Sequence, residues 1–207
     1  MKSVRIFYRK EGLLRYVSHL DMNRLFTRVL RRADLPLWYT EGFNPRPRLQ
    51  FALPLSLGWE SDWEIVDVRL DDDAFPNEEV HRRLAAAAPT GLTVFRVADP
   101  VRKPGEVAFA RFAVKAALPD VTPFFAQSEI LSEKKTKKGS MKTVDIRPWI
   151  ADWSRTADGL LLTLAAGQDN LSPALVLEAM GAFFGAPIAA DSIRRTMLLD
   201  AEKRDFV

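Results

Sequence analysis

The order in which strand-like and helix-like segments follow one another is the strongest constraint on the fold of this chain. Residues 3–10 alternate apolar and polar side chains, which predicts a strand. Residues 18–33 place apolar side chains at helical spacing between Ser18, a good N-cap, and Pro36, so they predict a helix. Two strands (49–57 and 62–70), a second helix (76–88) and a further strand (92–98) are predicted next. Residues 1–98 therefore have the order strand, helix, strand, strand, helix, strand.

The same order recurs after a charged, proline-bearing linker, residues 99–107. The predicted elements are a strand (109–118), a helix (122–134), two strands (142–153 and 159–166), a helix (172–184) and a strand (192–199). The lysine-rich residues 132–142 leave an alternative open, in which a long hairpin replaces the end of the first of these helices. We therefore expect an α+β fold of two ferredoxin-like βαββαβ halves, residues 1–98 and 108–207, each with an antiparallel sheet.

The composition excludes several classes of protein. The chain has no cysteine and only two histidines, His19 and His81, which excludes disulfides, thiol nucleophiles and iron–sulfur or thiolate-bound zinc centres. We therefore expect no metal and no cofactor. No apolar run is long enough to cross a bilayer, and the first 15 residues lack the apolar core of a signal peptide. We expect a cytoplasmic protein with no membrane contact.

The charge is unevenly distributed, although its net value is only +3. Residues 1–50 contain 11 basic and 4 acidic side chains, whereas residues 51–100 contain 4 basic and 10 acidic ones. A surface polarised in this way can steer an anionic partner. A separate run of lysines is typical either of weak phosphate contacts or of a solvated loop: Lys134, Lys135, Lys137 and Lys138.

Arginines of the first helix are candidates for binding a polyanion. Arg24, Arg28 and Arg31 fall at i, i+4 and i+7, which places them opposite the apolar stripe. Guanidinium groups suit phosphate oxygens, and several such contacts supply the salt-sensitive part of nucleic-acid affinity. The alternative is an ordinary solvated helix face.

The loop EGFNPRPRLQFALP, residues 41–54, is a second candidate. Its prolines Pro45 and Pro47 fix two φ angles, so little entropy is lost when the neighbouring Arg46 and Arg48 meet a ligand. Gly42 permits a sharp turn, and the amide of Asn44 lies beside the prolines. The alternative is a purely architectural turn into the next strand.

Aromatic residues and a histidine complete the candidates. Phe7, which alternates with Arg5 and Arg9 on the first strand, and Tyr39 are candidates for stacking an unpaired base, with burial in the core as the alternative. His19, at the start of the first helix, is a weak candidate for a general acid or base in RNA cleavage. Capping and loop anchoring explain it without chemistry.

The run YRKEGLLRYVSHLDMNRLFTRVLRRADLPLWYTEGFNPRPRLQFALPLSLGWES, residues 8–61, resembles the signature of an uncharacterised bacterial family of radical SAM-associated proteins. Members occur alone or joined to cobalamin-binding radical SAM enzymes. The residues that carry this resemblance are Gly12, Arg15, Tyr16, Ser18, His19, Asp21, Arg24, Gly42, Phe43, Asn44, Pro45, Pro47, Pro54, Gly58 and Glu60. The resemblance implies a radical SAM enzyme as partner, acting in RNA modification or translation. Without cysteines the chain cannot hold that enzyme's cluster itself.

Our leading interpretation is a non-catalytic RNA-binding or substrate-presenting accessory protein of a radical SAM enzyme. Two alternatives stay open, namely a metal-independent RNA-cleaving enzyme that uses His19 and a pure protein adaptor that docks the radical SAM enzyme. The sequence favours a non-enzyme and does not determine the oligomeric state. The residues expected to bind nucleic acid are Arg24, Arg28, Arg31, Asn44, Arg46 and Arg48.

Overall fold

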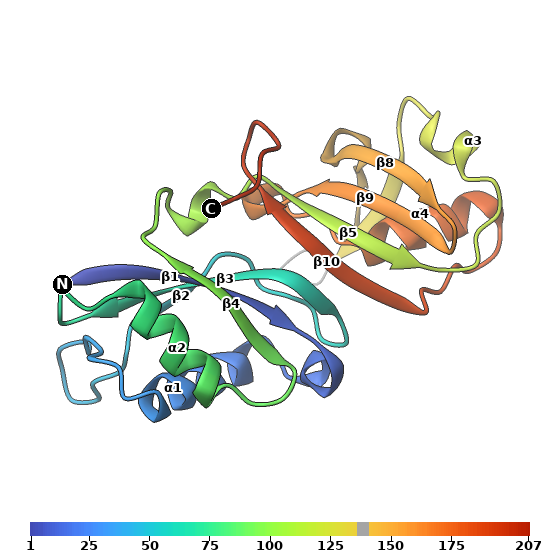
Figure 1. Ribbon diagram of the computed structural model, residues 1–207. Coiled ribbons are helices and arrows are strands. Elements are labelled where there is room, and N and C mark those ends of the chain that lie inside the picture. The colour runs from blue at the N-terminus through green and yellow to red at the C-terminus, as the bar shows by residue number, and fades with distance from the viewer. Residues whose placement is uncertain (136–140) are drawn as a thin grey trace.

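The structure is a computed structural model that describes residues 1–135 and 141–207. Figure 1 shows the first half of the chain, with two helices against a sheet, beside a second half with one long helix. The elements of the first half are β1 (Lys2–Lys10), η1 (Gly12–Tyr16), α1 (His19–Arg32), β2 (Leu49–Phe51), β3 (Glu60–Leu70), α2 (Asn77–Ala87) and β4 (Leu92–Ala98). The later elements are η2 (Pro104–Glu106), β5 (Phe109–Lys115), α3 (Thr122–Phe125), β6 (Leu131–Lys135), β7 (Met141–Asp145), η3 (Arg147–Trp149), β8 (Ile150–Thr156), β9 (Gly159–Ala165), η4 (Gly167–Asp169), α4 (Pro173–Phe184) and β10 (Ser192–Leu199).

One sheet runs through both halves. Its strand order is β4-β1-β3-β10-β5-β9-β8, with β2 also paired to β3, and β6 and β7 form a separate two-stranded sheet. Every pairing is antiparallel except that of β10 with β3, where Arg194 lies opposite Glu60 and Arg195 opposite Ser61. We call this β3–β10 contact the joint. The predicted mixture of a few helices with a mostly antiparallel sheet is confirmed, but the sheet is shared by both halves.

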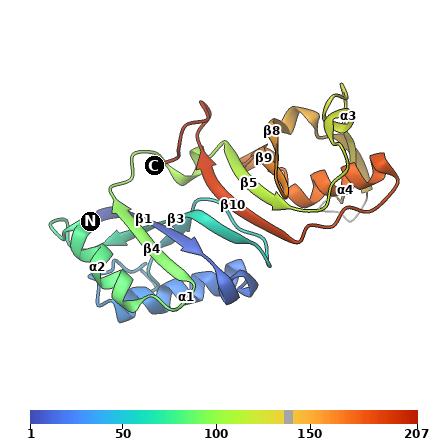
Figure 2. The same ribbon diagram turned by 45° about the vertical axis from the view of Figure 1, so that its right-hand side comes forward.

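The helix α1 forms where the capping and apolar pattern predicted it. Ser18 is the N-cap, and its hydroxyl oxygen accepts a hydrogen bond from the backbone N–H of Asp21. The apolar stripe is buried against the face of β1 that carries Val4, Ile6 and Tyr8. Figures 1 and 2 show α1 and α2 on the same side of β1, β3 and β4. Burial of each large apolar side chain stabilises this layer by about 1.5–3 kcal/mol.

The predicted helix over residues 122–134 is wrong beyond its first turn. The α3 helix ends at Phe125, and β6 and β7 form the hairpin that was the alternative for the described part of residues 132–142. Three polar residues, 127–129, follow one another after α3 and leave no apolar position for a helical stripe. Lys137 and Lys138 lie outside the described residues, as do the side chains of Lys134 and Lys135.

Two predicted strands are shorter than expected because of prolines. The strand predicted over residues 49–57 pairs only as far as Phe51, and Pro54 lies in the irregular segment that follows. The strand predicted over 142–153 is divided into β7 and β8 by the turn η3, which contains Pro148.

Among the described residues, none of the helices has the length and apolar character needed to cross a bilayer.

The prediction that Phe7 lies on an open sheet face and stacks a base is wrong. Phe7 is fully buried, and the aromatic rings of Trp63 and Phe95 pack against it. The guanidinium of Arg96 lies 4.9 Å from the centroid of the Phe7 ring, so a cation covers the aromatic side chain. Arg5, its neighbour on β1, is also fully buried. A base therefore has no access to this part of the sheet.

Candidate anion-binding surface

The loop between α1 and β2 folds back on itself, and its two sides are paired by bridges and hydrogen bonds. Isolated bridges pair Leu37 with Leu70 and Tyr39 with Pro47. Beyond them, the backbone N–H of Thr40 donates to the carbonyl oxygen of Arg46 (2.9 Å), and the N–H of Arg46 donates to the hydroxyl of Thr40 (3.1 Å). These bonds fix both sides of the loop tip. We call residues 37–48 the hook.

The tip of the hook exposes an aromatic ring, and two arginines follow it in the chain. Phe43 is 106% exposed relative to its reference state, so its ring packs against nothing in the described chain. Arg46 and Arg48 are also exposed, and neither forms an ion pair with a described carboxylate. Asn44 is exposed and forms no hydrogen bond that the structure describes, so Thr40, which the sequence analysis missed, closes the loop instead. The predicted Gly42 turn has φ of +120°, which favours glycine.

The arginines of α1 divide between two neighbours. Arg24 and Arg28 line a groove of about 390 Å³ together with Arg32, whereas Arg31 turns towards the hook, where its guanidinium lies 5.9 Å from the centroid of the Tyr39 ring. Arg28 forms no ion pair within the described part of the chain. The predicted row of Arg24, Arg28 and Arg31 therefore links the groove to the hook, with Arg32 as an addition.

Asp21 partly neutralises one end of this row. Its carboxylate accepts hydrogen bonds from the Ser18 hydroxyl (2.7 Å) and from Arg24 (3.0 Å). The Ser18 hydrogen bond first, and the Arg24 hydrogen bond and charge next, lower the pKa of Asp21 below its ordinary value. Arg28 and Arg31 are consequently the more available cations of the row.

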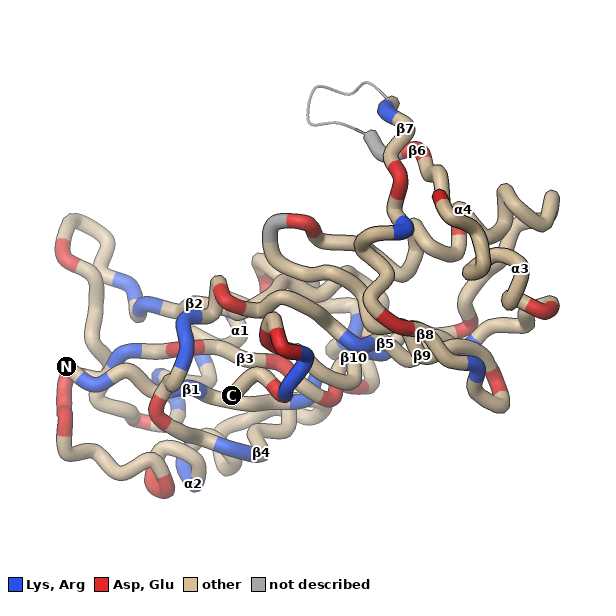
Figure 3. Tube along the Cα trace, turned by 90° about the horizontal axis from the view of Figure 1, so that it is seen from above, with Lys and Arg blue, Asp and Glu red and all other residues tan. Residues whose placement is uncertain are grey.

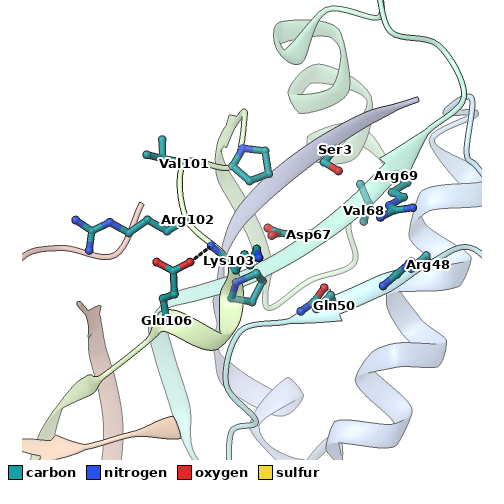
Figure 4. Close-up of a pocket in the computed structure, with 12 residues that line it drawn as sticks. Ser3, Arg48, Gln50, Asp67, Val68, Arg69, Val101, Arg102, Lys103 and Glu106 are labelled. Carbon is teal, nitrogen blue, oxygen red and sulfur yellow. Dashed lines mark hydrogen bonds between the residues drawn. The ribbon is translucent and has the colours of Figure 1, made fainter. Parts of the chain in front are cut away.

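A second pocket lies between the sheet and the linker, and Arg48 at the end of the hook lines it. It has a volume of about 560 Å³, and Figure 4 shows Arg48 and Arg69 at one end of it and Arg102 and Glu106 at the other. We call it the linker pocket. The remaining lining residues are Ser3, Gln50, Asp67, Val68, Pro100, Val101, Lys103 and Pro104. Figure 3 shows basic residues along the chain near β1, β2 and the linker.

The two arginine-rich pockets share no lining residue, so Arg48 belongs to a different cavity from Arg24 and Arg28. Arg69 and Lys103 were missed by the sequence analysis. The alternation of β3 places Arg69 on the same face as Asp67, a signal that was present. The position of Lys103 depends on how the linker crosses the sheet, which no local pattern encodes.

His19 is exposed at the start of α1, beside the aromatic ring of Phe51. Its ring packs edge-on against Phe51, with 5.1 Å between centroids, and makes no hydrogen bond in residues 1–135 or 141–207. It borders a cavity of about 10 Å³ with Tyr8, Lys10 and Glu64, which has room for about one water molecule.

Buried charges next to this cavity hold the joint together. Glu64 receives hydrogen bonds from Nε (2.8 Å) and Nη2 (2.6 Å) of Arg195, and both side chains are buried. Burial first, and the Glu64 charge next, raise the pKa of Tyr8, while burial lowers the pKa of Lys10. No local sequence pattern indicates this cluster, because the two partners are 131 residues apart.

A comparison with family models gives one match, to the uncharacterized protein conserved in bacteria (DUF2344), over residues 3–173. The chain belongs to this family. The match includes the hook, the groove beside α1 and the linker pocket, and it ends at the first residue of α4. The match confirms the expected bacterial family of uncharacterised proteins. The family description does not mention the radical SAM association that was expected from the sequence. A search of curated proteins found no match.

In this DUF2344 chain the expected motif residues fall into two clusters. The first cluster lies around η1 and continues into the start of α1 with Ser18, His19 and Asp21. In this cluster, the guanidinium of Arg15 stacks on the ring of Tyr16, and the carbonyl oxygen of Arg15 accepts a hydrogen bond from the N–H of Gly58 (2.7 Å). At the hook lie Gly42, Phe43, Pro45 and Pro47. The first cluster ties η1 to the start of β3. In the second, Gly42, Phe43 and Pro45 are exposed, whereas Pro47 is buried. No group of three or more metal-binding side chains is found among the described residues.

Proposed function

We propose that this protein is a non-catalytic RNA-binding or substrate-presenting accessory protein. The observation that carries the proposal is the exposed Phe43 ring at the tip of a closed hook that also presents Arg46 and Arg48 without carboxylate partners among the described residues. An aromatic ring stacks on bases of any sequence, and guanidinium groups bind the phosphates on either side. The Arg31–Tyr39 contact extends the cationic surface from the hook onto α1.

The partner that we propose is a radical SAM enzyme. The support is the resemblance of residues 8–61 to radical SAM-associated proteins, together with the absence of cysteine from the sequence, which requires the cluster to belong to another chain. In this arrangement the hook holds the RNA and the partner supplies the chemistry.

We also propose that each half is a ferredoxin-like unit. Support comes from the strand orders β4-β1-β3-β2 and β10-β5-β9-β8, in which the elements follow the sequence βαββαβ with the β6–β7 hairpin inserted. An experimental structure with these strand orders in both halves would agree with the proposal, and another order in either half would contradict it.

Fluorescence anisotropy with a labelled single-stranded RNA of about 12 nucleotides tests the RNA-binding proposal. The wild type should bind, and its affinity should fall steeply as salt rises because phosphate contacts release counterions. Phe43→Ala should weaken binding by about tenfold, since stacking on one aromatic ring contributes about 1–3 kcal/mol. The matched control is Phe183→Ala, which removes a 44% exposed phenylalanine from α4 in the other half.

Absence of binding, or equal losses in the two variants, contradicts the proposal. The same RNA incubated with wild type and His19→Ala tests the cleaving alternative. We expect intact RNA from both proteins on a denaturing gel. Cleavage by the wild type that is lost in His19→Ala would instead make His19 catalytic.

A protein adaptor is the second candidate function, because apolar side chains are exposed around the η1 cluster. Leu13, Tyr16, Leu20 and Leu57 are all more than half exposed, and the hydrogen bond between Gly58 and Arg15 brings Leu57 close to Tyr16. Purification from the native cell after nuclease treatment tests this function. Retention of a radical SAM enzyme that is lost in Leu57→Asp, with RNA affinity absent from the isolated chain, would favour the adaptor.

A further inference from the structure

The linker pocket is built where two basic residues face each other across neighbouring strands. Leu49 of β2 lies opposite Val68 of β3, so Arg48 and Arg69, the next residues along, come side by side, and Figure 4 shows both at the same end of the pocket. Like charges directly opposite one another destabilise a sheet. Neither guanidinium has a carboxylate partner in the described chain, so a bound anion would relieve their repulsion.

The carboxylates of the pocket are already engaged. Asp67 accepts two hydrogen bonds of 2.8 Å from the buried Arg5, which neutralises it. Glu106 accepts a hydrogen bond from the backbone N–H of Lys103 (3.0 Å) at the end of the pocket away from Arg48. Asp67 therefore already has a cation, and Glu106 lies at the other end of the pocket from Arg48.

The cations of the pocket are engaged to different degrees. Arg102 is bound by Asp200 and lies close to Glu202, whereas the side chains of Arg48, Arg69 and Lys103 form no ion pair with a carboxylate that the structure describes. Arg69 is positioned by Trp38, whose ring centroid lies 5.6 Å from the guanidinium carbon. Three positive charges without a described carboxylate partner thus line one open pocket.

A phosphomonoester matches this charge better than an internal phosphodiester does. A phosphomonoester carries about −1.5 to −2 charges at neutral pH, whereas each backbone diester carries one. The volume of about 560 Å³ lies within the range of small-ligand pockets and has room for a nucleotide beside its phosphate. The side chains of Ser3 and Gln50 line the same pocket and supply neutral hydrogen-bonding groups.

We propose that the linker pocket binds the terminal nucleotide of an RNA strand through its phosphomonoester, with Arg48, Arg69 and Lys103 as the phosphate ligands. The inference rests on the proposed RNA-binding function for the polymer, and it adds that the protein recognises an end of the strand. The hook would then contact the adjoining nucleotides, because Arg48 belongs both to the hook and to the pocket.

Isothermal titration calorimetry with 5′-AMP and adenosine probes the pocket directly. The wild type should bind 5′-AMP at least about tenfold more tightly than adenosine, because charge-assisted hydrogen bonds to phosphate contribute most of the affinity. Arg69→Gln and Lys103→Gln should each weaken 5′-AMP binding by about tenfold. Lys142→Gln, which removes an exposed charge from β7 in the other half, is the matched control and should change the affinity by less than about twofold.

Anisotropy with one RNA sequence bearing a 5′-phosphate, a 3′-phosphate or only hydroxyl ends then identifies the end that is recognised. One phosphorylated form should bind at least about tenfold more tightly than the hydroxyl form. Equal affinity for 5′-AMP and adenosine, no 5′-AMP binding, or equal affinity for all three RNAs overturns the inference. Binding of all three RNAs with equal affinity leaves the proposed function intact. Binding of 5′-AMP without binding of any RNA upholds the phosphate pocket and removes the proposed function.

Discussion

The arginines of the joint and those of the hook and α1 differ in their access to carboxylates. At the joint, Arg195 is buried with Glu64, and Arg194 forms ion pairs with three acids, Glu11, Glu60 and Asp62. On the surface, Arg28, Arg46 and Arg48 form none with the described acids. A buried cation needs an internal partner because desolvation is costly, whereas an exposed one can remain available. Arginines that are paired with carboxylates thus stabilise the fold, whereas arginines without such a partner among the described residues are available to bind a ligand.

The largest effect should come from removing one buried charge at the joint. Arg195→Ala leaves the Glu64 carboxylate buried without its cation, so we expect the free energy of unfolding to fall by about 3–5 kcal/mol. Urea denaturation followed by circular dichroism measures this change. Arg28→Ala, from the exposed group, should change it by no more than about 0.5 kcal/mol.

The apolar double variant Glu64→Leu with Arg195→Met sharpens this result. It removes both charges, so it should be more stable than Arg195→Ala alone. If Arg195→Ala and Arg28→Ala had equal effects, the division between structural and available arginines would not hold.

The next effect should appear in RNA affinity and not in stability. The double variant Arg46→Gln with Arg48→Gln should bind RNA about tenfold more weakly and reduce the slope of log affinity against log salt by about 1.4, which is about 0.7 for each lost phosphate contact on a single strand. Anisotropy at several salt concentrations measures both quantities. Lys142→Gln, an exposed charge on β7, is the control, and an equal change in that variant would show that only net charge matters.

A smaller effect should follow from the backbone of the hook. Gly42 has φ of +120°, so Gly42→Ala should lower the free energy of unfolding by about 1 kcal/mol. Gly105 in the linker has no positive φ, and a methyl group added there would meet no atom within 4 Å, so Gly105→Ala should be neutral or slightly stabilising. Thermal unfolding of the two variants makes the comparison. A neutral Gly42→Ala would mean that the tip relaxes without strain.

The smallest effect should be the acid sensitivity of Asp200, which directly follows β10. Burial alone would raise its pKa, but hydrogen bonds from Arg204 and the charges of Arg102 and Arg204 lower the pKa of Asp200 below its ordinary value. Because the folded pKa lies below the unfolded one, the stabilisation is present above about pH 4 and is lost as the pH falls through the folded pKa. The difference in unfolding free energy between wild type and Asp200→Asn should shrink over that range. A constant difference would contradict this.

The sequence predicted features that are encoded by neighbouring residues. Ser18, the apolar stripe and the basic last turn specified α1, and Pro45, Pro47 and Gly42 indicated a stiff loop, because capping and φ restriction act locally. The exposure of Phe43 was not predictable, since an aromatic in a sequence is more often buried.

Contacts between segments that are distant in the sequence were the features that the sequence did not predict. The pairing of β10 with β3 and the Glu64–Arg195 ion pair join positions that no local pattern connects. The burial of Arg5 and Phe7 and the formation of the linker pocket both depend on distant segments lying over the first half of the sheet. Alternation identified the face to which Arg5 belongs, but not what covers that face.

The pairing of β10 with β3 also imposes an order on how this protein can mature during synthesis. The ribosome makes β3 long before β10, so the edge of β3 near Glu60 stays unpaired, and Glu64 lacks its cation, until residues 192–199 have emerged. An unfinished chain therefore exposes the unpaired edge of β3, which can associate with other strands, and the Glu64 carboxylate, whose burial without a cation is unfavourable. The first half can therefore reach its final, fully paired structure only after β10 of the second half has been synthesised.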